Sequence, residues 1–109
     1  MRDTLSRAKL ESLGGGRFRV SGVLDATTVG DVLKQSKDRF SNLDRLAIDL
    51  AGVSDSDSSG LALLLEWLRL AKESKREISF VNVPGQISAL ARISEVEDLL
   101  SASTAVATS

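Results

Sequence analysis

The chain of 109 residues carries fourteen Lys and Arg against fifteen Asp and Glu, and it contains neither His nor Cys. This length suits one domain with a single modest core. Without His and Cys the usual zinc ligands, the thiolate nucleophile and the commonest general base are missing, so we expect no catalytic residue, no metal and no cofactor. The near-neutral charge, with only three Phe and one Trp, argues against a nucleic-acid-binding surface.

The distribution of apolar residues along the chain bears on the cellular location of the protein and on the extent of its folded domain. Residues 1–13 lack the apolar core of a signal peptide, and the richest apolar run, Leu61 to Leu65, stops at Glu66. We therefore expect a cytoplasmic protein without direct membrane insertion. Residues 1–100 should form the single domain, and residues 101–109, which are Ser, Ala, Thr and one Val, should be a disordered tail.

The first half of the sequence predicts a hairpin, a helix and a buried strand. Alternating apolar residues on either side of Gly14 to Gly16 indicate two short strands with a glycine turn. Thr28 and Asp31 have the spacing of a capping box, which starts a helix ending near Phe40. Leu46 to Leu50 is an apolar run typical of a central strand buried on both faces.

The second half alternates helix and strand. A polar segment, residues 53–60, leads into a helix over 59–74, and a strand over 76–83 follows. Pro84 suits the first turn of a third helix, and Val96, Leu99 and Leu100 suggest a closing segment. The order ββαβαβα predicts an α/β sandwich: a mixed β-sheet of about four to five strands with about three to four helices mainly on one face.

The helix over 59–74 has more apolar surface than one core contact needs. Leu63, Trp67 and Leu70 form a second stripe about 180–240° around the helix from Leu61. The first helix of the domain can cover this stripe. Alternatively, part of it is exposed as a protein-binding surface, because Trp is enriched among interface anchors.

The loop before this helix, Asp57-Ser58-Ser59-Gly60, admits three interpretations. Ser58 or Ser59 can simply cap the helix, with Asp57 orienting a hydroxyl. A phosphate cradle is disfavoured because the Walker pattern needs a Lys that is absent here. Ser58 can also be a phosphorylation site, since a helix start tolerates a dianion. Catalysis by Ser58 is disfavoured because no base accompanies it.

Three segments together resemble the STAS domain family: Val20 to Asp25, Leu46 to Leu50 with Val53, and Asp57 to Leu61. The resemblance covers about residues 10–100. It implies a domain that binds other proteins and is not an enzyme. In the anti-sigma factor antagonist branch the serine at the Ser58 position is phosphorylated by a partner kinase.

The run Gly60 to Trp67 resembles the MlaB branch of that family more closely. This resemblance implies a subunit that binds and supports the cytoplasmic ATPase (MlaF-like) of an Mla-type phospholipid-transport ABC complex, and through it the permease, in maintaining outer-membrane lipid asymmetry. The protein would then be peripheral to the inner membrane. The protein-binding residues would be Asp57, Ser58, Ser59, Gly60, Leu63, Trp67 and Leu70. The alternative is an antagonist regulated by phosphorylation at Ser58.

Overall fold

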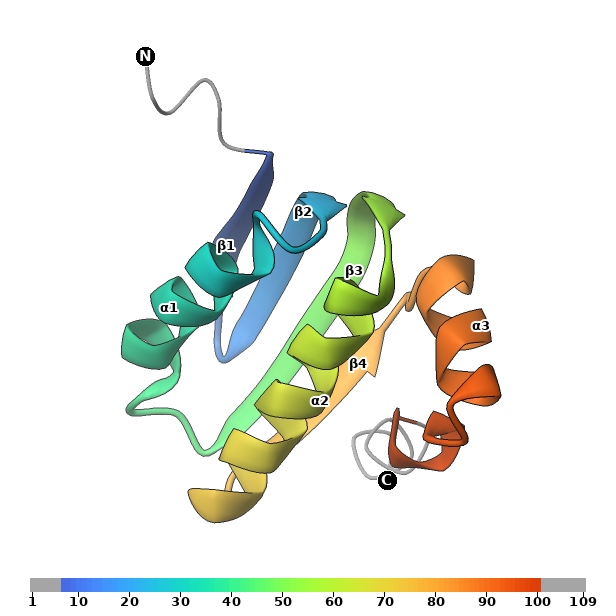
Figure 1. Ribbon diagram of the computed structural model, residues 1–109. Helices are drawn as coiled ribbons and strands as arrows, with labels where there is room; N and C mark the ends of the chain where they lie inside the picture. Colours follow the sequence, from blue (N-terminus) through green and yellow to red (C-terminus); the bar gives the residue numbers. More distant parts are fainter. Residues whose placement is uncertain (1–6, 101–109) are drawn as a thin grey trace.

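The computed structural model describes residues 7–100 as one sheet with three main helices. The strands are β1 (Ala8–Gly14), β2 (Arg17–Leu24), β3 (Arg45–Ser56) and β4 (Glu77–Val81), and the helices are α1 (Val29–Phe40), α2 (Ser58–Glu73) and α3 (Gly85–Ile93). A short helical turn over 97–100 ends the described part. The predicted mixed α/β architecture and the element order are confirmed (Figure 1).

The sheet has the order β1-β2-β3-β4. β1 and β2 are antiparallel, whereas β2, β3 and β4 are parallel to one another. The predicted glycine turn joins β1 to β2, and Gly14, Gly15 and Gly16 all have positive φ, which costs glycine little. Each parallel pair is linked by a helix, as crossover connections require.

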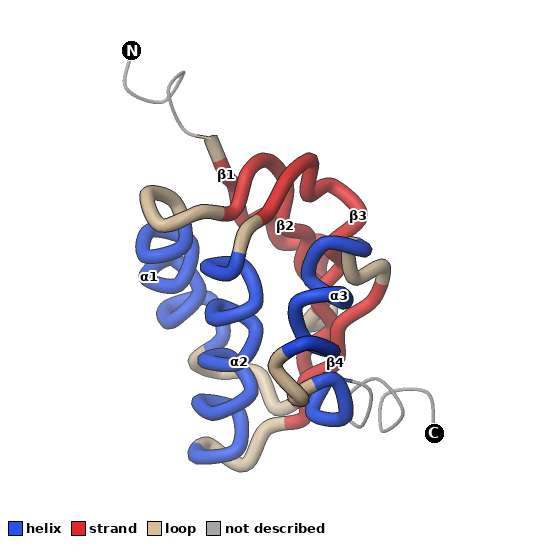
Figure 2. The backbone as a smooth tube through the Cα atoms, turned by 45° about the vertical axis from the view of Figure 1, so that its right-hand side comes forward, coloured by secondary structure: helices blue, strands red, loops and turns tan. Residues whose placement is uncertain are grey.

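All three main helices lie on one side of the sheet (Figures 1 and 2). The side chains beneath them are buried and include Val20, Leu24, Ile48 and Leu50. On the opposite face Ala47 and Asp49 of β3 are half-buried, and Asp49 pairs with Arg19 of β2 at 3.5 Å. The prediction that this strand is buried on both faces is wrong, because no helix of the described chain crosses that side.

Several predicted boundaries move in the structure. β3 continues to Ser56, because the polar residues after Leu50 extend its pairing with β2. Thr28 does take the N-cap position of α1, but the capping box with Asp31 does not form. Instead the Thr28 hydroxyl donates to the carbonyl of Val23 at 2.8 Å and ties the cap to the end of β2.

The chain's four aromatic side chains form one connected cluster under the helices. Phe18 of β2 meets Phe40 of α1 edge-on, with ring centroids 4.9 Å apart. Phe40 lies 5.7 Å from Trp67 of α2, and Trp67 stacks on Phe80 of β4 at 6.4 Å. The indole N–H of Trp67 donates to the hydroxyl of Ser36 at 2.8 Å, which satisfies its only polar atom inside the core. This cluster joins both long helices to the sheet.

We predict that Trp67→Ala lowers the free energy of unfolding by about 3–5 kcal/mol, because it removes a large buried side chain. Ile93→Ala is the control, since Ile93 is 78% exposed and its truncation should cost no more than about 0.5 kcal/mol. Urea unfolding of both variants gives the comparison. Equal, small losses would show that Trp67 lies outside the core.

Candidate functional site: the helix-start edge

The three parallel strands end at one edge of the sheet, where the three main helices begin (Figure 1). We call this the helix-start edge; it comprises residues 25–28, 55–59 and 82–86. Hydrogen bonds connect the three segments. The backbone N–H of Asp57 donates to the carbonyl of Leu24 at 3.2 Å, and the Gln86 amide donates to Asp55 at 2.7 Å. The edge is therefore one continuous surface built from three separate parts of the sequence.

Asp57 is the N-cap of α2. Its carboxylate accepts the backbone N–H of Ser59 at 2.7 Å, and its own backbone is extended. The expectation that Ser58 or Ser59 caps the helix is wrong, because α2 begins one residue earlier than predicted and Asp57 takes that position. A carboxylate at a helix start is stabilised by the unpaired N–H groups and by the helix dipole.

Ser58, the first residue of α2, is exposed, and Ser59 behind it is half-buried. Asp57 supplies the cap, so the Ser58 side chain is not needed for it. The Ser58 hydroxyl makes no hydrogen bond to another residue in the range 7–100. The hydroxyl is therefore available to a partner. Its position is fixed by the first turn of a sixteen-residue helix rather than by a free loop.

Gly60 fixes how closely α2 approaches the end of β3. A Cβ placed on Gly60 would collide with the hydroxyl of Ser56 and would lie 3.2 Å from a methyl group of Ile87 in α3. Gly60 is thus a buried packing residue. The glycine sets the depth at which the start of α2 meets α3 and the sheet.

The first segment of the edge is held by Asp25. One of its carboxylate oxygens accepts the hydroxyl of Thr27 at 2.6 Å and the backbone N–H of Thr27 at 2.9 Å. The other pairs with Arg7 at 2.7 Å. The Thr27 hydroxyl, the Thr27 N–H and the Arg7 guanidinium together lower the pKa of Asp25. This carboxylate stays charged at neutral pH and keeps the segment before α1 in a fixed turn.

The structure separates the predicted site residues into two groups. Asp57, Ser58, Ser59 and Gly60 are together at the helix-start edge. Leu63 and Trp67 are only 3% and 2% exposed, so an exposed docking stripe is wrong for both, because both side chains belong to the core. Leu70 is half-buried near the other end of α2. The alternative in which the first helix covers this stripe is the one observed for Trp67, whose bond to Ser36 joins the two helices.

Sequence reasoning did not include Asp55 and Gln86 in the site. Both lie on the helix-start edge: Asp55 is near the end of β3, just before α2, and Gln86 is in the first turn of α3. The sequence could have indicated Gln86, because it lies two residues after Pro84, at the predicted start of the third helix. Helices that follow parallel strands all begin at the same edge of the sheet. Their pairing required knowledge of the strand order.

The edge has the chemistry of a binding surface. Its charged groups are the carboxylates of Asp25, Asp55 and Asp57, and its exposed nucleophile is a serine without a histidine anywhere in the chain. Over residues 7–100 no group of three or more acidic side chains is placed to hold a metal ion. Over the same range no helix has both the length and the apolar character needed to cross a bilayer. The hydroxyl can contact a protein or receive a phosphoryl group from another enzyme.

Comparison with known proteins agrees with this architecture. The family model described as "Mlab, STAS domain" matches residues 11–101. A solved structure of the anti-sigma factor antagonist SpoIIAA in its unphosphorylated form is similar, with a TM-score of 0.65 and 17% identity over 84% of this chain and 83% of that one. A search of curated proteins finds no match. The chain belongs to the MlaB-like family of STAS domains, and the likeness to SpoIIAA shows the shared fold.

We predict opposite effects from adding a methyl group to two helix glycines. Gly60→Ala should destabilise the fold by about 1–3 kcal/mol, because the new Cβ has no room beside Ser56. Gly30→Ala in α1, where the Cβ meets nothing within 4 Å, should stabilise it by up to about 1 kcal/mol. Thermal melting of both variants measures the difference. A Gly60→Ala protein as stable as the parent would refute the close packing of α2 on β3.

Proposed function

We propose that this chain is a non-enzymatic subunit that binds the cytoplasmic ATPase of an Mla-type phospholipid-transport ABC complex through the helix-start edge. The contact residues are Asp57, Ser58 and Ser59, with Gly60 setting the position of the helix beneath them. By favouring an assembled or active state of the ATPase, the subunit supports transport that maintains outer-membrane lipid asymmetry. It would then be peripheral to the cytoplasmic side of the inner membrane.

One observation carries this proposal: an exposed Ser58 hydroxyl on a rigid helix start, in a chain of the MlaB-like STAS family. A rigid, exposed hydroxyl loses little conformational entropy on binding, which favours association. The carboxylates of Asp55 and Asp57 on the same edge favour a partner surface with Lys or Arg residues. STAS domains act in protein–protein interactions, and this edge offers polar groups from three segments that stay fixed relative to one another.

The second candidate function is an anti-sigma factor antagonist switched by phosphorylation at Ser58. The exposure of Ser58 at the first position of α2 favours it, since a kinase can reach the hydroxyl and the helix dipole stabilises the product. Asp57 opposes it, because its carboxylate already accepts a backbone N–H at this helix start and would repel a phosphate beside it. The two functions differ in whether the native protein ever carries phosphate.

For the ATPase-binding function we predict that Ser58→Thr keeps the complex and Ser58→Asp disrupts it. Threonine retains the oxygen and adds one methyl group, whereas aspartate places a second carboxylate beside Asp57 in a contact surface, at a cost of several kcal/mol. The measurement is recovery of the ABC ATPase and permease with the tagged chain from detergent-solubilised membranes. Gene deletion should reproduce the Ser58→Asp phenotype, seen as sensitivity to detergent with EDTA.

Ser94→Asp is the matched control, because Ser94 is exposed at the end of α3, away from the helix-start edge, and the charge change is the same. It should leave ATPase recovery unchanged. Intact-mass analysis of the chain from its own cells separates the two functions. Stoichiometric phosphate on Ser58, with an intact membrane barrier in the deletion strain, would replace the transport function with the antagonist function.

A further inference from the structure

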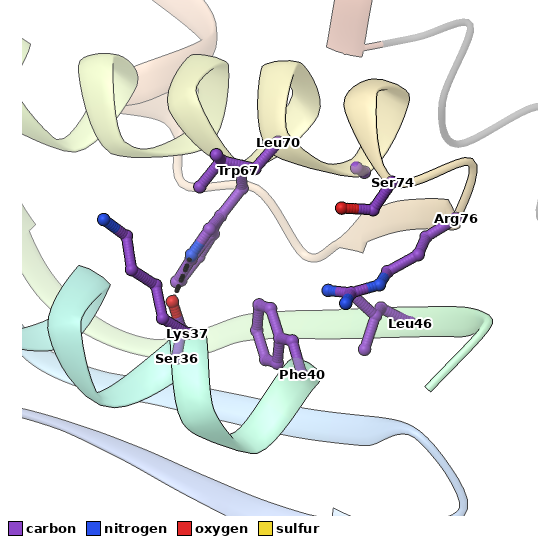
Figure 3. A pocket seen from close by; sticks show the side chains of 9 residues that line it. Ser36, Lys37, Phe40, Leu46, Trp67, Leu70, Ser74 and Arg76 are labelled. Carbon is purple, nitrogen blue, oxygen red and sulfur yellow. Dashed lines mark hydrogen bonds between the residues drawn. The ribbon is translucent and has the colours of Figure 1, made fainter. Parts of the chain in front are cut away.

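A hollow of about 180 Å³ lies at the opposite end of α2 from Ser58, between the last turns of α1 and α2, the start of β3 and the segment that precedes β4 (Figure 3). Its floor is apolar and belongs to the core: Phe40, Leu46 and Trp67 are each no more than 4% exposed. Leu70 forms part of one wall. An enclosed apolar cavity of about 150 Å³ admits benzene, and this hollow, which is partly open to solvent, has a volume of the same order.

Two cationic side chains border the apolar floor. Lys37 comes from α1, and Arg76 comes from the segment before β4. In Figure 3 the Arg76 guanidinium and the Ser74 hydroxyl lie on the same side of the hollow, and Lys37 lies across from them. The carbonyl of Ser41 accepts one N–H of Arg76 at 3.1 Å, which holds the guanidinium in place while most of its donors stay available.

The charges around the hollow are not balanced by acidic groups. No Asp or Glu lines it, and neither Lys37 nor Arg76 makes an ion pair with a residue in the range 7–100. Glu66, the acidic group whose pKa Lys37 helps to lower, is engaged chiefly by Arg69, which donates to both of its oxygens. An apolar floor between two unpaired cations favours a ligand with an apolar body and one negative charge.

We propose that this hollow binds a small free carboxylic acid with an arylalkyl or short alkyl body. The carboxylate would accept hydrogen bonds from Arg76 and Ser74, and the apolar body would lie on Trp67 and Phe40. Arg suits this role because its planar guanidinium matches a carboxylate with two parallel hydrogen bonds. The proposal is independent of ATPase binding, because the hollow and the helix-start edge lie at opposite ends of α2.

The test uses the fluorescence of Trp67, the only Trp in a chain without Tyr. Titration of the full chain with 3-phenylpropionate should give a saturable change in indole emission. The neutral isostere 3-phenylpropanamide should bind at least about tenfold more weakly, because it lacks the charge that Arg76 and Lys37 recognise.

Arg76→Gln should weaken 3-phenylpropionate binding by about tenfold or more. The double variant Arg76→Gln with Lys37→Gln should bind still more weakly. Arg92→Gln on α3 removes the same charge away from the hollow and should leave binding unchanged. Melting curves show whether each variant is folded, and both lining positions lie at the surface end of the hollow. The absence of a saturable signal, equal binding of acid and amide, or equal effects of Arg76→Gln and Arg92→Gln would each overturn the proposal.

Discussion

The position of α2 depends on the burial of Trp67. This side chain contacts aromatic rings of both α1 and β4 and also donates a hydrogen bond to Ser36. A buried indole N–H without an acceptor costs about 1–3 kcal/mol, so the pairing with Ser36 makes one orientation of the two helices favourable. The Ser36 hydroxyl in turn donates to the carbonyl of Leu33 at 2.6 Å, which fixes its own direction.

With its middle fixed in this way, α2 presents a different chemistry at each end. At its start, Asp57 caps the helix and leaves Ser58 exposed among carboxylates. At its far end, Lys37 and Arg76 border an apolar hollow whose floor includes the same Trp67. The start is acidic and hydroxylated, and the end is cationic and apolar. A single helix therefore separates the surface proposed to bind a protein partner from the hollow proposed to bind a small anion.

Most of the fold could be predicted from the sequence because hydrophobic period and glycine position are local signals. The glycine turn at Gly14 to Gly16 and the end of α1 at Phe40 follow from them. Whether Leu63 and Trp67 are buried or exposed could not be predicted. A second apolar stripe on a helix has the same sequence pattern whether a neighbouring helix or a partner protein covers it. Likewise the cap was expected at Ser58 or Ser59 but is Asp57, because Asp and Ser both cap helices and the three residues are adjacent. Only the length of β3 decides between them.

The proposed contact between the helix-start edge and the partner ATPase can be measured in the assembled complex. Hydrogen–deuterium exchange of the chain, free and within the complex purified with its ATPase, measures this directly. Backbone amides over 57–61 and 85–88 should exchange more slowly in the complex, while those over 70–76 at the far end of α2 should be unchanged. Protection confined to the far end of α2, or to the open face of the sheet, would contradict the account.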